Sequence, residues 1–174
     1  MSQARLQAGR KACPSLLIVD AQSVKNTDTA EEKGYDAGKK VSGIKRHIAV
    51  DILGWPHAIA VTPANVTDRK GAITALTPVA AKMPGVQSIL GDAGYTGKSF
   101  AEDIRKCFKS DVHVQIAKRH ELHTFVVIPK RWVVERTFSW LEKCRRLWKN
   151  CERKLNTSLQ FVYLAFLALL LRRT

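Results

Sequence analysis

The chain has 174 residues, 45% of them hydrophobic, so it is long enough for one domain with a sizeable buried core. Its 29 Lys and Arg against 15 Asp and Glu give a formal net charge of +14. This favours an anionic partner, most commonly nucleic acid; the alternatives are a protein that is merely basic and one that binds acidic lipid. The most apolar stretch, residues 161–171, is shorter than the roughly 20 residues that span a bilayer, so it predicts a buried helix and no membrane contact.

The first half of the chain predicts strands. Residues 1–14 are polar and are expected to form a flexible segment ahead of a single domain at residues 15–174. The sequence SLLIVD predicts a short buried strand that ends at Asp20, and residues 26–43 are rich in glycine and polar residues, as in a loop. Alternation in KRHIAVDILG and the following WPHAIAV predicts two strands joined as a hairpin, the second ending at Pro63.

Helices and strands alternate in the second half. Residues 67–83 predict a helix capped by Thr67 or Asp68 and interrupted at Pro78, because proline cannot donate a backbone hydrogen bond. A strand at 86–92, a helix at 97–108, a strand at 111–118 and a largely helical segment from Trp132 onwards follow. This order predicts an α/β fold with a mixed five-stranded sheet, flanking helices and a long C-terminal helical region.

Two aspartates follow buried strands. Asp20 comes after LLIV and Asp92 after SILG, and strand ends are where α/β sheets expose functional side chains. If the two strands are neighbours, the carboxylates converge and repel unless a cation lies between them, for which Mg²⁺ or Mn²⁺ is suited. The alternative for each aspartate is that it caps the following turn.

A third acid lies on a basic segment. Residues 129–154 contain nine Lys or Arg and three Glu. Apolar residues recur there at spacings of three and four from Val134 to Leu155, which predicts one amphipathic helix, with Glu135 beside the apolar stripe. A solvated helix face is the alternative explanation of the charges. Asp51 and Asp68 are the main rival acids, and Asp68 is the better candidate for a helix cap.

Five segments together resemble a known family. They are IVDAQSVK, GYDAGKKVSGIKRHIAVDILG, TPANVTDRKGA, GDAGYTG and RWVVERTFSWLEKCRRL. In this order they resemble the catalytic part of bacterial insertion-sequence DDE transposases of the insertion sequence five type, over residues 15–155. The resemblance implies an RNase H-like fold and a triad of two Asp and one Glu, at Asp20, Asp92 and Glu135. The triad is expected to bind two Mg²⁺ or Mn²⁺ ions.

The activity implied is metal-dependent cleavage at insertion-sequence ends, followed by strand transfer into target DNA. Tyr95, Arg131 and Lys143 correspond to a Tyr, Arg and Lys signature of related elements. These elements usually place the Lys seven positions after the Glu, where this chain has Glu142. The alternatives are a general RNase H-like nuclease and an inactive or repurposed fragment that binds DNA without cutting it.

Several basic residues are expected to contact DNA. A cluster just before and within the second strand is typical of a phosphate-binding edge, or else of lysine protection of an edge strand. The full set of expected DNA-binding residues is Lys39, Lys40, Lys45, Arg46, Tyr95, Arg131, Arg136, Lys143, Arg145 and Arg146. The four tryptophans could stack on flipped bases, although core packing is the stronger expectation for Trp140 and Trp148.

The resemblance also implies partners and location. The protein is expected to act on element ends and target DNA as a homo-oligomer, in the bacterial cytoplasm and associated with the nucleoid. Related proteins carry an N-terminal helical DNA-binding region ahead of the first Asp. Only nineteen residues precede Asp20 in this chain, so that region is expected to be absent or to be supplied by a separate polypeptide.

Overall fold

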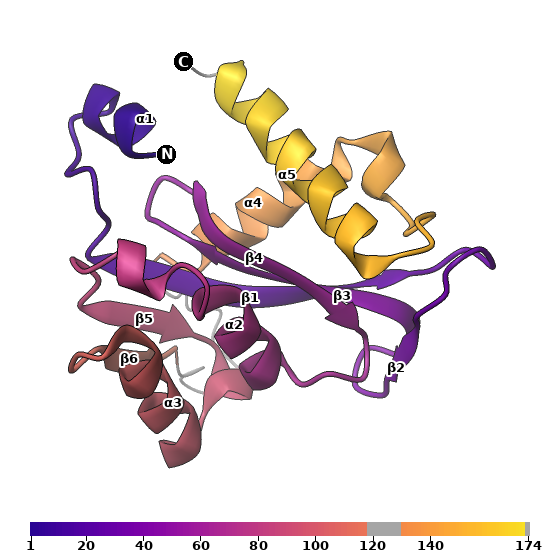
Figure 1. Cartoon of the computed structure of the whole chain (residues 1–174), viewed down its shortest axis with the longest axis horizontal. Coiled ribbons are helices and arrows are strands. Elements are labelled where there is room, and N and C mark those ends of the chain that lie inside the picture. Colours follow the sequence, from indigo (N-terminus) through magenta and orange to yellow (C-terminus); the bar gives the residue numbers. More distant parts are fainter. Residues whose placement is uncertain (118–129, 173–174) are drawn as a thin grey trace, which may run out of the picture.

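The computed structural model describes residues 1–117 and 130–172. A mixed sheet carries helices on both faces (Figure 1). The strands are β1 (Leu16–Lys25), β2 (Gly34–Asp36), β3 (Val41–Val50), β4 (Pro56–Pro63), β5 (Ser88–Gly91) and β6 (His113–Ile116). The helices are α1 (Ser2–Gln7), α2 (Asp68–Leu76), α3 (Lys98–Phe108), α4 (Trp132–Glu142) and α5 (Leu155–Leu171), with short 3-10 turns at Ala80–Lys82, Ala93–Tyr95 and Arg145–Leu147.

The strand order confirms the predicted mixed sheet, which has six strands because the short β2 adds to the predicted five. β3 pairs antiparallel with both β1 and β4, whereas β5 pairs parallel with β1 and β6 parallel with β5. The short β2 pairs with β3 and lies inside the stretch that the sequence predicted as a loop. The last residue of the strand predicted at 111–118 lies outside the described residues.

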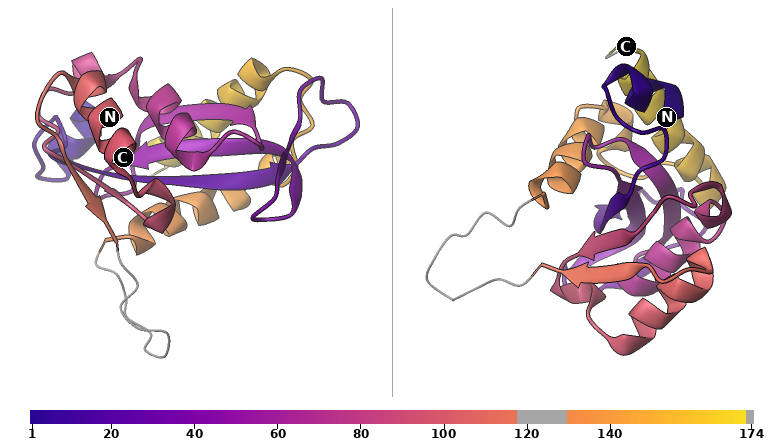
Figure 2. Two further views of the ribbon diagram at one scale, coloured as in Figure 1. Left: turned by 90° about the horizontal axis from the view of Figure 1, so that it is seen from below. Right: turned by 90° about the vertical axis from the view of Figure 1, so that its left-hand side faces the viewer.

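Alternation along β1 assigns its two faces, since successive side chains of a strand point to opposite sides. Leu17 and Val19 belong to the core under α2 and α3, whereas Ile18 belongs to the core under α4 and α5 (Figure 2). Asp20 and Gln22 follow Ile18 by the same alternation. Their side chains therefore lie on the face of the sheet that α4 covers.

The predicted end of the first strand was wrong. β1 continues to Lys25, and Asp20 pairs with Ile48 of β3 in the middle of the strand. The strand that ends near Asp20 is β5, the other neighbour of β1, which stops at Gly91. Asp20 therefore lies beside a gap in the sheet where β1 is no longer paired with β5. We call this gap the notch.

Helix α2 follows the prediction. The side chain of Thr67 caps it by accepting a hydrogen bond from the backbone N–H of Lys70, and the helix ends at Leu76, ahead of Pro78.

The C-terminal region is helical, but the single helix predicted to continue to Leu155 was wrong. α4 ends at Glu142, and α5 begins only at Leu155. Between them, the buried Asn150 donates from its backbone to the carbonyl of Lys25 and from its side chain to Asn26. These bonds to the end of β1 replace the helical hydrogen bonds that the local pattern favours.

Helix α5 is buried on one side only. Val162, Ala165 and Phe166 pack into the core, whereas Tyr163 and Leu167 on the other side are exposed. The prediction that residues 161–171 form a buried helix therefore holds only for the side of α5 that carries Val162, Ala165 and Phe166. Among the described residues, no helix combines the length and the apolar character needed to cross a bilayer.

The segment ahead of β1 contacts the domain. Asp51, fully buried after β3, accepts hydrogen bonds from the backbones of Leu53 and Trp55 and lies 3.2 Å from Nε2 of His57. Its carboxylate also binds the guanidinium of Arg5, a buried residue of α1. Part of the segment predicted to be flexible is thus a helix with a buried ion pair, and its flexibility stays a prediction.

Candidate metal centre

Asp20 and Asp92 lie side by side at the notch in the sheet. Ile18 of β1 pairs with Leu90 of β5, so continuing this parallel register places Asp20 next to Asp92. Asp92 directly follows β5 and caps the turn Ala93–Tyr95 by accepting a hydrogen bond from the backbone of Gly94. Asp92 therefore caps this turn and also lies next to Asp20.

Arg131 connects the third acid to this pair. Its guanidinium Nη2 lies 3.4 Å from Oδ2 of Asp92, and its Nε lies 3.5 Å from Oε1 of Glu135, one turn along α4. The side chain of Glu135 is 60% exposed. Glu135 thus belongs to the same group of charges, although in this arrangement it faces a guanidinium.

The electrostatics of Asp20 favour a cation. Burial raises its pKa to about 6, although the backbone hydrogen bond from Ala21 lowers it, and the neighbouring Asp92 raises it further. A divalent ion would offset both the lost hydration and the repulsion, and carboxylate oxygens are the donors that Mg²⁺ and Mn²⁺ prefer. The donor chemistry fits the implied metal. Within residues 1–117 and 130–172, however, no three acidic, His or Cys side chains are grouped closely enough to bind an ion.

The pKa of Asp20 predicts a pH-dependent stability. Its folded pKa of about 6 exceeds the ordinary 3.8, so the folded protein holds the extra proton and stability falls as pH rises through this window. Without divalent metal, we expect Asp20→Asn to raise the free energy of unfolding at pH 7.5, by no more than about 3 kcal/mol. The gain should nearly vanish at pH 4, which urea unfolding at the two pH values checks. An equal gain at both pH values would contradict burial as the cause of the raised pKa.

Five of the expected DNA-binding residues are exposed. These are Lys39, Lys40, Lys143, Arg145 and Arg146. Arg131 is partly exposed and contacts the acids. The side chain of Arg146 bonds to Glu152 and lies over the ring of Phe161. These residues remain candidates for phosphate contacts.

Lys45 and Arg46 are buried, contrary to a role at a DNA-facing edge. β3 is covered on both faces, which leaves Lys45 only 6% and Arg46 only 3% exposed. Lys45 forms ion pairs with Asp36 and Asp68, at 3.2 and 2.9 Å, and Arg46 donates to the carbonyl of Leu147. Both side chains are therefore engaged inside the fold instead of facing the phosphates of a bound duplex.

Tyr95 and Arg136 also support the fold. Tyr95 is 1% exposed and packs against Phe100, so its side chain underlies the acids instead of reaching DNA. Arg136 lies over the rings of Trp132 and Trp140 and donates to the carbonyl of Leu53, which ties α4 to the β3–β4 hairpin.

The sequence missed three features around the acids. Asp68 is the first residue of α2, and it also forms an ion pair with the buried Lys45. Glu142 accepts a hydrogen bond from the side chain of Gln22, at 3.0 Å. Trp148 was expected in the core but is 66% exposed. The sequence did show that Glu142 stands where related elements carry Lys. Local spacing could not show that its side chain contacts Gln22 of β1.

The fold and the acids agree with a family assignment. The family model described as "Transposase DDE domain" matches residues 11–171. The chain therefore belongs to the transposase DDE domain family.

Relatives bear names of the same kind. The chain is 33% identical over 123 residues to a protein of Burkholderia cepacia named "Putative transposase for insertion sequence element IS402", covering 64% of this chain and 55% of that protein. The chain thus spans about half the length of that relative. It is 28% identical over 131 residues to "Putative transposase for insertion sequence element IS6501" of Brucella ovis, covering 74% of this chain and 98% of that protein.

Among solved structures, a chain in "CryoEM structure of simian T-cell lymphotropic virus intasome in complex with PP2A regulatory subunit B56 gamma" matches with a TM-score of 0.47 and 18% identity. The match covers 75% of this chain and 40% of that chain.

Proposed function

We propose that residues 15–174 form the catalytic domain of a DNA transposase, which cleaves DNA at insertion-sequence ends and transfers the strand to target DNA. The observation that carries the proposal is the convergence of Asp20 and Asp92 at the notch in the sheet, with Glu135 joined to them through Arg131. Family membership supports this function, and the names of both relatives agree with it.

The residues that would hold the divalent ions are Asp20, Asp92 and Glu135. When bound, Mg²⁺ or Mn²⁺ ions would polarise the scissile phosphate and acidify an attacking hydroxyl or water. The chain itself supplies a rigid carboxylate at Asp20 and a cation at Arg131. Because Arg131 contacts both Asp92 and Glu135, it is placed to exchange these acids for a DNA phosphate.

DNA is the proposed partner, bound as a homo-oligomer that holds element ends and target together. The exposed cations of the segment after α4 and of the β2–β3 turn would contact phosphates. Sequence recognition is assigned to an additional DNA-binding region, since phosphate contacts position a protein without reading bases.

The test is a cleavage and joining assay on element-end DNA with Mg²⁺ or Mn²⁺. A transposase gives both nicked ends and products joined to target DNA. Cleavage without joining would indicate a general nuclease, and DNA binding without either product would indicate an inactive fragment.

Binding to DNA should weaken steeply with salt, because the net charge is +14 and each phosphate contact releases counterions. Four phosphate contacts would lower affinity about 150-fold over a fourfold rise in salt. Fluorescence anisotropy over a salt series measures the slope. Replacing Arg145 and Lys149 by Gln should make the slope shallower, whereas Lys106→Gln on α3 should leave it unchanged. A flat salt dependence of the wild-type protein would contradict the expected contacts.

A further inference from the structure

The notch connects the two faces of the sheet. Because β5 ends at Gly91, side chains from either face can approach Asp20 and Asp92 beyond that point. Asp20 lies on the face that α4 covers, whereas α2 packs on the opposite face (Figure 1). The proposed metal centre uses side chains from the α4 face and from the end of β5, so what reaches the notch from the α2 face has no role in it.

Asp68 is a fourth acid at the notch, and it comes from the α2 face. It is the first residue of α2, and its side chain is 28% exposed. A Cβ atom added to Gly94 would lie 3.0 Å from Oδ1 of Asp92 and 3.9 Å from Oδ2 of Asp68. Both carboxylates therefore border the same small space, which glycine leaves open.

The other oxygen of Asp68 is bound to the fold. Nζ of the buried Lys45 lies 2.9 Å from Oδ1 of Asp68 and 3.2 Å from Oδ2 of Asp36. Lys45 also donates to the carbonyl of Val66, so its position does not depend on Asp68 alone. The ion pair fixes Asp68 against the sheet through Oδ1, and Oδ2 is the oxygen that faces Gly94.

The hydroxyl of Tyr95 lies among these acids without a partner. Tyr95 is 1% exposed, and its hydroxyl oxygen has no hydrogen-bond partner among the described residues. Its ring packs on the backbone of Gly91, where an added Cβ would lie 2.9 Å from the ring. Burial raises the pKa of the hydroxyl, and the charges of Asp20, Asp68 and Asp92 raise it further. Because an unpaired buried hydroxyl is costly, this arrangement indicates a polar ligand at the notch.

A hydrated divalent ion is the ligand that fits these groups. Within residues 1–117 and 130–172, no three acidic, His or Cys side chains are grouped closely enough to bind an ion directly. Mg²⁺, however, loses its water reluctantly and is usually held by one or two carboxylates while it keeps several waters. Groups that hydrogen-bond around the direct ligands tune the affinity for the ion. A carboxylate accepts hydrogen bonds from such water, and a tyrosine hydroxyl can donate or accept.

We propose that Asp68 and Tyr95 hold the hydration water of a divalent ion bound at Asp20 and Asp92, from the α2 face of the sheet. Oδ2 of Asp68 accepts hydrogen bonds from this water, and the hydroxyl of Tyr95 gains the partner that it lacks. Both are positioning residues, because neither touches the ion. The inference rests on the proposed function, since it takes the metal centre to be formed by Asp20, Asp92 and Glu135. It adds that the ion is held from both faces of the sheet.

The test is a Mn²⁺ titration of the DNA-free chain, with the bound ion measured by electron paramagnetic resonance. Asp68→Asn keeps the shape of the side chain and should weaken Mn²⁺ binding about tenfold, as the loss of a group around the direct ligands does. Tyr95→Phe removes one hydroxyl and should weaken binding about threefold, the scale of one hydrogen bond. Asp92→Asn removes a direct ligand and should abolish binding.

The matched control is Asp36→Asn. Asp36 is the other acid that pairs with Lys45, so this variant removes the same charge from the surroundings of the lysine. Asp36 is not among the charges that act on Asp20 or Tyr95, so the affinity for Mn²⁺ should not change. An equal loss of affinity in Asp36→Asn and Asp68→Asn would trace the effect to Lys45 and overturn the inference.

Stability without metal separates a binding role from a structural one. Removing an unpaired buried hydroxyl strands no partner, so Tyr95→Phe should not lower the urea midpoint of the metal-free chain. A lower midpoint would overturn the role assigned to the hydroxyl. If Asp68→Asn and Tyr95→Phe bind Mn²⁺ as the wild type does while Asp92→Asn does not, the inference is overturned and the proposed metal centre stands. If the wild-type chain binds no Mn²⁺, with or without element-end DNA, both fall.

Discussion

Replacing any one of the three acids is expected to abolish DNA cleavage while sparing DNA binding. Asp20→Asn, Asp92→Asn and Glu135→Gln each keep the shape of the side chain and remove a charge that a divalent ion requires. Cleavage of element-end DNA should fall at least about 100-fold, since preorganised charge supplies much of such a rate. Affinity for DNA, measured by anisotropy, should change little because phosphate contacts come from other residues.

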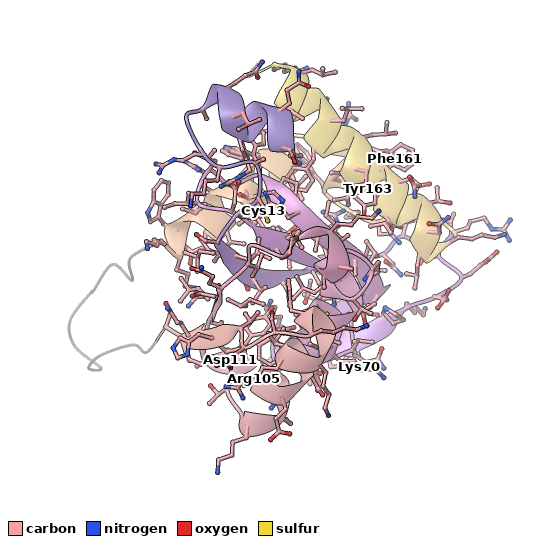
Figure 3. The ribbon with its side chains drawn as sticks, turned by 60° about the vertical axis from the view of Figure 1, so that its left-hand side comes forward. Cys13, Lys70, Arg105, Asp111, Phe161 and Tyr163 are labelled. Atoms are coloured by element: carbon pink, nitrogen blue, oxygen red, sulfur yellow. The ribbon has the colours of Figure 1, made fainter. Side chains whose placement is uncertain are left out.

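The matched control is Asp111→Asn, at an exposed aspartate between α3 and β6 that pairs with Arg105 (Figure 3). It should cleave as the wild type does. A variant of Asp20, Asp92 or Glu135 that retained full cleavage would remove that acid from the site. A variant that lost binding and cleavage together would point instead to a role in folding.

The second large effect concerns stability. Asp51→Asn leaves the buried guanidinium of Arg5 without its ionised partner, and breaking a buried ion pair costs about 3–5 kcal/mol. For a chain of this size, the melting temperature should fall by roughly 10 °C. Arg5→Met in the same background should restore part of the loss, because the unpaired charge is then gone. Urea unfolding of the two single variants and the double variant measures the coupling.

The contacts of Asp51 also determine how its stabilising effect depends on pH. Although burial raises the pKa of Asp51, hydrogen bonds from His57 and Arg5 lower it below its ordinary value. The stabilisation is therefore present at neutral pH and is lost as pH falls through the folded pKa. A loss below 0.5 kcal/mol for Asp51→Asn, on the scale of about ±0.5 kcal/mol typical of neutral surface changes, would contradict the buried pair. Because Asp51→Asn is expected to destabilise the fold, this variant cannot serve as a control that leaves cleavage unchanged.

The sequence predicted the strands and the helices between them, because alternation of apolar residues is a local pattern. It placed Asp92 directly after its strand, as found, but placed Asp20 at a strand end, whereas Asp20 lies in the middle of β1. It did not predict that β3 is covered on both faces. From Gly43 to Val50 every residue of this strand is buried. Lys45 and Arg46 therefore look like edge cations in the sequence and are internal in the fold, where Asp36, Asp68 and a backbone carbonyl satisfy them.

Long-range contacts explain the other differences. Apolar spacing alone continues α4 through Trp148 to Leu155, but Asn150 binds the end of β1 and breaks the helix. Trp148 is thereby turned to the surface. Glu135 was predicted correctly on the helix, whereas its contact with Arg131 depends on how α4 lies over the sheet, which no local pattern specifies. Whether the three acids share metal ions stays a prediction.

The three candidate ligands differ in how much conformational freedom their side chains retain. Asp20 belongs to a ten-residue strand that stays paired with β3 on one side. Asp92 lies in a tight turn, and Glu135 extends from the first turn of α4 with its side chain 60% exposed. Ordering a free side chain costs entropy, and the carboxylate of Asp20, which is largely buried and accepts a hydrogen bond from the backbone of Ala21, has little left to lose. Asp20 thus provides a fixed reference point, and the entropic cost of assembling the site falls mainly on Glu135.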